Sequence, residues 1–401
     1  MGDIVERVVR KNTNNESSLP LTISAQYGLV DQITYFNNRV ASRDVSNYYL
    51  VLNGEFAYNK STSDGFPFGA VKRLDLYEKG VLSTLYIVFS IKNQSEIDSD
   101  YLTVFFDTDR WHKGVSERAA EGARNHGLLN ISADDFFDID IFLPRHKEEQ
   151  VAIGSYLRHL DNLITLHQRK YDKLTNVKKS MLEKMFPKNG SNVPEIRFKG
   201  FTEAWEQRKV SDLAEKTYGG GTPTTSNEAY WNGDIPWIQS SDVVDGKLLG
   251  VEPRKWITQD GLNNSAAQRI PGNSIAIITR VGVGKLAFMP YSYATSQDFL
   301  SLSKLNAEPL FTVYACYKKL QSELNAVQGT SIKGITKDEL LAKNIMVPRY
   351  AEQQQIGAFF KQLDNLITLH QCEFQIVSKR RKARLRRRAF EFTVIFALIV
   401  L

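Results

Sequence analysis

LDNLITLHQ stands at residues 160–168, and the same nine residues recur at 363–371, which is 203 positions later. An identity of this length at so long a spacing indicates an internal repeat rather than an accident of composition. The repeat predicts a chain built from two copies of one unit. Three shorter matched pairs lie upstream of the nine residues: 149–154 with 352–357, 141–145 with 345–349, and 131–132 with 335–336.

Apolar residues continue each copy at steps of four and three, which is the spacing of a coiled-coil seam. We predict that each copy becomes a long helix. The two seams are equivalent and are expected to pack on each other, antiparallel if the intervening domain returns the chain. The seam comprises Ile153, Leu157, Leu160, Ile164 and His167 in the first copy, and Ile356, Phe360, Leu363, Ile367 and His370 in the second.

Polar residues within the repeat need their own interpretation. His167 and His370 lie on the seam, where a polar residue commonly sets helix register. Metal binding by the two histidines would require further ligands, and the sequence offers no obvious cluster. Asp161 and Asp364 lie off the seam, so we expect them to face solvent or a partner.

The segments around the two helices predict the domain organisation. A polar break rich in proline and glycine at 187–194 ends the first helix. Short β-like runs at 49–52, 85–89, 275–278 and 299–302 lie in the segments outside the helices. We therefore predict an α+β fold in which two mixed α/β domains are joined by two long antiparallel helices in a pseudo-twofold repeat. The predicted segments are a first globular domain at 1–145, a first helix at 146–188, a second globular domain at 193–347, a second helix at 348–390, and an atypical apolar tail at 391–401.

The charge of the chain is unevenly distributed. The 401 residues include 51 Lys and Arg and 45 Asp and Glu, for a net charge of +6. Eight of the basic residues lie at 379–388, and the rest of the chain carries −2. Net charge therefore gives no argument that the folded domains bind nucleic acid. Two cysteines exclude a disulfide scaffold and a Cys-rich zinc site. Without a signal peptide or an apolar run of membrane length, we expect a cytoplasmic protein with no membrane partner.

No stretch of the sequence forms a convincing catalytic site. GVGKL at 282–286 lacks the glycine spacing and the Ser or Thr of a phosphate-binding loop. Residues 242–247 resemble a carboxylate–lysine nuclease set only superficially, and the Asn/Asp-Pro-Pro-aromatic motif of amino-methyltransferases is missing. We therefore expect no catalytic residue, no metal and no cofactor in this chain.

Several loops of both globular domains combine short polar side chains with aromatic neighbours. Asn, Gln, Arg and Lys can read base edges in the major groove of DNA, while Ser and Thr bind phosphates. The alternative is that these are ordinary polar surface loops. The candidate DNA-binding residues are Tyr58, Asn59, Lys60, Ser61, Lys72, Arg124, Asn125 and His126 in the first domain, and Thr222, Thr224, Thr225, Ser226, Gln239, Ser240, Ser241, Arg280, Lys285, Gln328, Thr330 and Lys333 in the second.

The order of these motifs resembles that of the DNA specificity subunits of type I restriction-modification systems. The matching motifs are GGTP-x-TS at 220–226, W-x-GDIPWI at 231–238, SSD at 240–242 and RVGVGK at 280–285. The first domain resembles an alternative form of the family's motifs at 56–60 and 69–72, and a Pro with a following Glu-Gln-x-x-Ile-Gly forms the entry to each predicted helix.

The resemblance implies a function without catalysis in this chain. Each globular domain would be a target recognition domain that reads one half of a bipartite site in double-stranded DNA. The helices would set the spacer between the halves and bind two methyltransferase subunits, which carry S-adenosylmethionine. Restriction motor-nuclease subunits, which use ATP and Mg, would complete a bacterial or archaeal complex for endonuclease cleavage and DNA methylation.

Three other hypotheses remain open at this point. A self-sufficient DNA nuclease or methyltransferase would be active as a purified chain, and a structural coiled-coil adaptor would leave no footprint on DNA. The third rests on the two helices, which diverge in sequence after Gln371, where the second copy continues into the basic run. The seam reaches Val377 and then meets Arg381 and Arg384. This divergence suggests a frameshifted, truncated or silent recombining copy of a specificity subunit.

Overall fold

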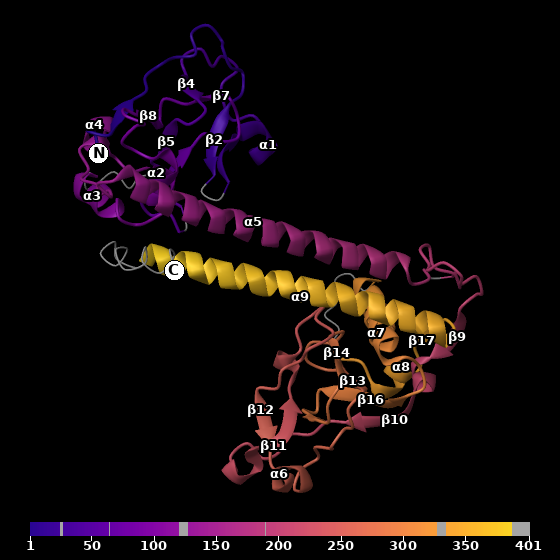
Figure 1. Cartoon of the computed structure of the whole chain (residues 1–401). Helices are drawn as coiled ribbons and strands as arrows, with labels where there is room; N and C mark the ends of the chain where they lie inside the picture. Colours follow the sequence, from indigo (N-terminus) through magenta and orange to yellow (C-terminus); the bar gives the residue numbers. More distant parts are fainter. Residues whose placement is uncertain (25–26, 64, 120–126, 189, 327–333, 387–401) are drawn as a thin grey trace. The chain divides into compact units, whose positions relative to one another are not determined.

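The computed structural model describes residues 1–24, 27–63, 65–119, 127–188, 190–326 and 334–386 (Figure 1). The chain divides into two compact units, and each takes a part of both long helices. The first unit comprises Met1–Thr165 and the described part of Gln375–Leu401, and the second unit comprises Leu166–Phe374. The compact units therefore cut across the predicted helical segments instead of leaving them between the domains.

The first unit is built on a four-stranded antiparallel sheet in the order β1-β8-β5-β6. Two-stranded sheets β2-β3 and β4-β7 accompany it. Aromatic rings fill the core under the four-stranded sheet, where Tyr58 stacks on Phe136 at 4.4 Å and Phe56 on Phe89 at 5.4 Å. The strands are β1 (Val5–Arg7), β2 (Leu21–Ser24), β3 (Gly28–Asp31), β4 (Tyr49–Leu52), β5 (Phe56–Asn59), β6 (Ala70–Arg73), β7 (Lys79–Leu82) and β8 (Ile87–Ile91), and the short helices are α1 (Gln32–Phe36), α2 (Ser99–Phe106), α3 (His112–Arg118) and α4 (Ala133–Phe137).

The second unit contains two larger sheets and one short antiparallel pair, β9-β17, whose strands are far apart in the sequence. The antiparallel sheet β10-β16-β13-β14 lies beside β12-β11-β15, in which β11 and β15 run parallel. The elements are β9 (Glu206–Lys209), β10 (Ala214–Gly219), β11 (Trp231–Ile238), β12 (Lys255–Ile257), β13 (Ser274–Ile278), β14 (Leu286–Met289), β15 (Ala294–Thr295), β16 (Phe299–Leu305), β17 (Asn344–Val347), α6 (Gln259–Asn263), α7 (Pro309–Ala326), α8 (Lys337–Leu341) and the 3-10 turns η2 (Val210–Leu213), η3 (Glu228–Tyr230) and η4 (Ser240–Asp242). The α+β prediction is confirmed, and all four predicted β-like runs overlap strands.

The two long helices are α5 (Lys147–Lys184) and α9 (Tyr350–Arg386). In the second unit they run antiparallel, because His167 contacts His370 while Lys178 contacts Asp364. The seam residues Phe360 and Leu363 are buried. They also pack on α7 and the end of α5, so each seam serves the core of a globular domain as well as the opposite helix. In the first unit Leu157, Leu160 and Val377 form one buried cluster with Val104 of α2.

A glutamine in the repeated sequence holds the start of each long helix to its own globular domain. The Gln150 side chain accepts a hydrogen bond from the Asp98 amide at 2.9 Å and donates to the Pro144 carbonyl at 3.0 Å. The Gln353 side chain accepts from the Glu308 amide at 2.9 Å and donates to the Pro348 carbonyl at 2.8 Å. Buried amides need such partners, which explains why the glutamine recurs in both copies.

The repeated glycine allows a close approach at the same place. A Cβ on Gly154 would lie 2.6 Å from the amide nitrogen of Tyr101, in the first turn of α2. A Cβ on Gly357 would lie 2.9 Å from the amide nitrogen of Phe311, in the first turn of α7. Both distances are too short for a real side chain. Each long helix therefore crosses the N-terminus of a shorter helix at a glycine.

The seam histidines form a direct pair. The Nδ1 atoms of His167 and His370 lie 3.1 Å apart, and their rings are 5.3 Å apart. A hydrogen bond between two imidazoles needs one donor and one acceptor, so at least one ring is neutral. This contact places both histidines between the two long helices. Among the described residues, no group of three or more His, Cys, Asp or Glu side chains could hold a metal ion.

The pair predicts a loss of stability in mild acid. Desolvation lowers the pKa of His370, and the charges of Lys170 and His167 lower that pKa further. Because the folded pKa lies below the unfolded value of about 6.5, this contribution is full above that pH and is lost as the pH falls. We expect the melting temperature of the second unit to drop between about pH 7 and pH 5. The variant His370→Gln should show a shallower dependence, and an identical slope in both proteins would contradict the assignment.

No helix in the described ranges is both long and apolar enough to cross a membrane.

Candidate nucleic-acid interface

The glycine-rich loop at 220–226 is fixed to the second unit by its backbone. The Gly221 amide donates to the Thr295 carbonyl at 2.8 Å, and the buried indole of Trp237 donates to the Gly221 carbonyl at 2.9 Å. A Cβ on Gly220 would lie 1.8 Å from the carbonyl oxygen of Ser296. The two glycines therefore press against the protein and leave Thr224, Thr225 and Ser226 exposed.

The segment 295–298 connects this loop with the other candidate segments of the second unit. The hydroxyl of Thr222 donates to the Gln297 side chain at 2.5 Å. The Ser296 amide donates to the Ile238 carbonyl at 2.9 Å, directly before Gln239. The Thr279 amide donates to the Asp298 carbonyl at 2.8 Å, directly before Arg280. Three segments far apart in the sequence thus meet at one turn, which we name the 295–298 turn.

The side chains around the 295–298 turn are polar and accessible. Gln297, Ser241 and Arg280 are exposed, and Gln239 and Ser240 are half-buried. Lys285 is also half-buried, because its side chain lies over the turn that follows Arg280. Such a set combines side chains that read bases with side chains that bind phosphate.

A lysine and two tryptophans lie on β11 and β12 of the same sheet. The Lys255 ammonium lies 5.4 Å from the ring centre of Trp231 and 5.9 Å from that of Trp237. The Trp231 indole donates to the Thr224 carbonyl at 3.3 Å, so this cation lies beside the exposed part of the loop. Neighbouring Arg254 is exposed and pairs with Asp242 at 3.4 Å.

In the first unit, the polar loop after β5 pairs with residues that follow α3. The Thr62 amide and hydroxyl both donate to the Gly127 carbonyl, at 2.6 and 3.0 Å. Ser61 forms an isolated bridge with Leu128, and the Asn59 side chain accepts from the Ser61 amide at 3.0 Å. Ser61 is exposed and Asn59 is half-buried.

The prediction that Tyr58 binds DNA is wrong. Its side chain is fully buried and its hydroxyl donates to the Phe68 carbonyl at 2.9 Å, so it cannot reach a base. Burial also raises the pKa of the Tyr58 hydroxyl. Phe56 and Tyr58 of β5 lie in one buried cluster and Ala57 lies in another, so both faces of this strand are covered. Tyr58 packs the sheet and does not read DNA.

The two candidate lysines of the first unit point toward protein groups. The Lys60 ammonium donates to the Ile131 carbonyl at 3.3 Å. The Lys72 ammonium pairs with Asp107 at 2.7 Å, and both side chains are largely buried. Six further candidates lie outside the described residues: Arg124, Asn125, His126, Gln328, Thr330 and Lys333. The predicted tail at 391–401 lies outside them as well.

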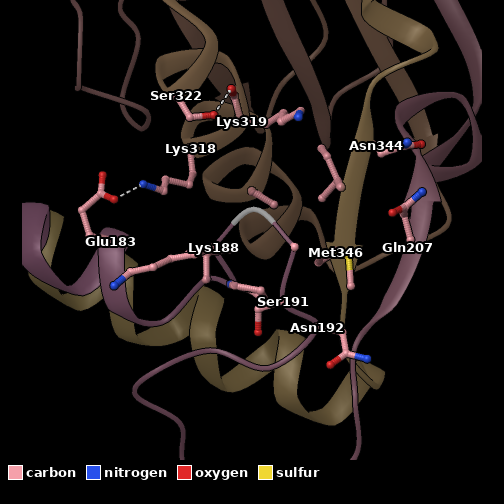
Figure 2. A pocket seen from close by; sticks show the side chains of 15 residues that line it. Glu183, Lys188, Ser191, Asn192, Gln207, Lys318, Lys319, Ser322, Asn344 and Met346 are labelled. Atoms are coloured by element: carbon pink, nitrogen blue, oxygen red, sulfur yellow. Dashed lines mark hydrogen bonds and ion pairs between the residues drawn. The ribbon is translucent and has the colours of Figure 1, made fainter. Parts of the chain in front are cut away.

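A cavity of about 730 Å³ lies elsewhere in the second unit, between the end of α5, α7 and β17 (Figure 2). Its lysines already have acidic partners. Lys318 pairs with Glu183, Lys319 with Glu323 at 3.2 Å, and Lys188 with Glu195 at 3.2 Å. A phosphate or another anion would therefore compete with carboxylates there, and the 295–298 turn is the better candidate interface.

Residues 202–376 match the family model described as the type I restriction modification DNA specificity domain. The MjaIX type I restriction enzyme specificity subunit of Methanocaldococcus jannaschii is 28% identical over 182 residues, which are 44% of this chain and 41% of that subunit. The EcoR124I/EcoR124II specificity subunit of Escherichia coli is 28% identical over 265 residues, 64% of this chain and 62% of that subunit. This chain is therefore similar to type I restriction specificity subunits.

A solved structure agrees with this relationship at the level of the fold. The type I restriction-modification system S subunit from M. genitalium aligns with a TM-score of 0.59 and 12% sequence identity, over 96% of this chain and 93% of that one. The alignments with the two relatives above span less than two thirds of the length of each relative.

The part of the chain that matches the family model contains the whole candidate interface of the second unit. It includes residues that sequence reasoning missed, namely Gln297 in the 295–298 turn and the cations Arg254 and Lys255 on the neighbouring sheet. One feature of the sequence could have predicted the turn. The polar run Thr-Ser-Gln-Asp at 295–298 connects the buried strands β15 and β16.

Proposed function

We propose that this chain is the DNA sequence-specificity subunit of a type I restriction-modification complex. Each unit would read one half of a bipartite site in double-stranded DNA, and the two long helices would set the spacer between the halves. The observation that carries the proposal is the convergence of three loops on the 295–298 turn, inside the residues that match a DNA specificity domain. The internal repeat supports one reader in each half of the chain.

The proposal assigns the chemistry to partner subunits. Two methyltransferase subunits, supplying S-adenosylmethionine, would bind the helices, and a motor-nuclease subunit that uses ATP and Mg would complete the complex. This chain would contribute recognition and positioning by loops that contact base edges and phosphates. The competing proposal of a self-sufficient nuclease or methyltransferase predicts activity from the purified chain alone, with metal or S-adenosylmethionine added.

Domain exchange tests the proposal. Residues 194–345 of this chain would be replaced by the recognition domain of another specificity subunit, and methylated adenines would be mapped across a genome. We expect one half of the methylated motif to change completely and the other half to stay the same, because each reader is a separate unit.

The control is the reciprocal exchange of residues 1–140, which should change only the other half. Changes in both halves after a single exchange would contradict the assignment of one unit to one half. Absence of any methylation by the unmodified chain with its methyltransferase subunits would contradict the proposed function itself.

A further inference from the structure

A buried ion pair joins the two long helices within the second unit. The Lys178 ammonium on α5 lies 2.5 Å from a carboxylate oxygen of Asp364 on α9. The two side chains are only 10% and 13% exposed. The pair is also bonded to the globular part of the unit, because Tyr314 of α7 donates to Asp364 at 2.6 Å and Lys178 donates to the Gly246 carbonyl at 3.0 Å.

A second ion pair joins the helices within the first unit. The guanidinium of Arg381 on α9 contacts the carboxylate of Asp161 on α5, with one nitrogen 3.0 Å from Oδ2. The same nitrogen lies 2.9 Å from Asp107, the residue that follows α2 in the globular part. Asp107 in turn accepts from Lys72 of β6 at 2.7 Å. This pair also connects both helices to the globular part of its own unit.

The two pairs are equivalent under the internal repeat. Asp161 and Asp364 are 203 residues apart, and so are Lys178 and Arg381. The acidic residue of each copy therefore pairs with the basic residue that follows the nine repeated residues in the other copy. The expectation that the aspartates face solvent or a partner is wrong for Asp364, whereas Asp161 pairs with Arg381 and its side chain remains 38% exposed. Their cations lie far away in the sequence, which is why the helical pattern alone missed them.

This equivalence also corrects the interpretation of the basic run. The sequence diverges after Gln371, but α9 continues to Arg386, and Val377 lies in the buried cluster of the first unit. Arg381 stands at the position that Lys178 has in the first copy, and it pairs with Asp161 as Lys178 pairs with Asp364. Arg384 follows one turn later and lies 6.0 Å from the ring of Tyr156. Through Arg384 the basic run therefore belongs to the folded helix pair.

We propose that Asp161–Arg381 and Asp364–Lys178 are paired clamps, each fixing the register of α5 against α9 and holding one recognition unit on the helices. The inference rests on the proposed function, since the clamps would act as positioning residues for DNA reading. Loosening one clamp would let its unit shift along the helix pair. A shift of about 3.4 Å corresponds to one base pair of DNA, so the tolerated spacer would broaden.

Partial desolvation makes the Asp161–Arg381 clamp sensitive to loss of its cation. Desolvation raises the pKa of Asp161 even though Arg381 opposes that rise through its hydrogen bond and charge. Removing the guanidinium would leave the half-buried carboxylate of Asp161 without its cation, whereas Asp107 keeps Lys72. Loss of one partner of a partly desolvated ion pair is destabilising, so the local structure is expected to loosen.

The test compares Arg381→Ala with Arg380→Ala in the assembled methyltransferase complex. Arg380 is the matched control, because it is an exposed arginine in the same basic run and the same helix. The readout is the fraction of methylated sites whose spacer is one base pair longer or shorter than in the unmodified protein. We expect Arg381→Ala to raise this fraction about tenfold or more, and Arg380→Ala to leave it unchanged.

A second variant keeps the test decisive if Arg381→Ala does not fold. Asp107→Ala leaves the helix–helix pair in place and removes the bonds of Arg381 and Lys72 to residue 107, so it should broaden the spacer and speed amide exchange at the end of α2. Unchanged spacer and exchange in Asp107→Ala, or equal effects of Arg381→Ala and Arg380→Ala, would overturn the clamp. If the unmodified complex methylates no bipartite motif, the proposed function has failed instead.

Discussion

Replacing Phe360 with alanine is expected to lower the free energy of unfolding of the second unit by about 3–5 kcal/mol. The side chain is fully buried. Its ring lies 5.0 Å from Tyr314 of α7 and 6.0 Å from Phe186, just beyond α5. The substitution therefore opens a cavity where both long helices and the globular domain meet. Denaturant unfolding followed by tryptophan fluorescence would measure the loss.

A leucine on the same helix provides the control. Leu369 is 51% exposed, and its replacement by alanine should change the free energy by no more than about 0.5 kcal/mol. A loss below about 1 kcal/mol for Phe360→Ala would mean that the helix pair does not form part of the core of this unit. Comparing Phe360→Ala with Leu369→Ala thus tests whether seam residues pack the two helices together and also form part of the core of the globular domain.

The repeat explains how much of the fold the sequence could predict. Periodic apolar residues such as Leu160 and Leu363 identify helices locally, because the period of a helix is visible in any stretch of two or three turns. Short strands such as β4 and β13 were also visible as apolar runs between turn residues. These features depend on neighbours within about ten residues, and the prediction was correct for them.

The residues that were misplaced depend on distant partners. Asp161 was expected at the surface, yet it pairs with Arg381, which is 220 positions away. Tyr58 has polar neighbours in the sequence, but the strand turns its side chain into an aromatic core. The 295–298 turn gathers its partners only when β11, β13 and β16 have folded. The periodicity of apolar residues carries no information about which distant residues pair. The internal repeat does carry some, because it relates the Asp161–Arg381 pair to the Asp364–Lys178 pair.

The glycines of the 220–226 loop give the sharpest test of the candidate interface. In Gly220→Ala, the new methyl group would lie 1.8 Å from the Ser296 carbonyl oxygen and 2.5 Å from the Thr295 hydroxyl. The Ser296 carbonyl belongs to the backbone and can move only if the 295–298 turn moves. The 220–226 loop must therefore shift away from its position. We expect specific binding of the half-site read by the second unit to weaken roughly 10- to 100-fold, since each lost base contact costs about 1–3 kcal/mol.

The adjacent glycine is the matched control for that measurement. A Cβ on Gly219 would meet no atom within 4 Å, so Gly219→Ala should bind DNA as the unmodified protein does. Both variants would be assayed in the methyltransferase complex on sites that differ only in the half read by the second unit. Equal affinities for Gly219→Ala and Gly220→Ala would separate the loop from DNA recognition. A loss for Gly220→Ala alone would identify the 295–298 turn as the platform that presents Thr224, Thr225 and Ser226 to the bases.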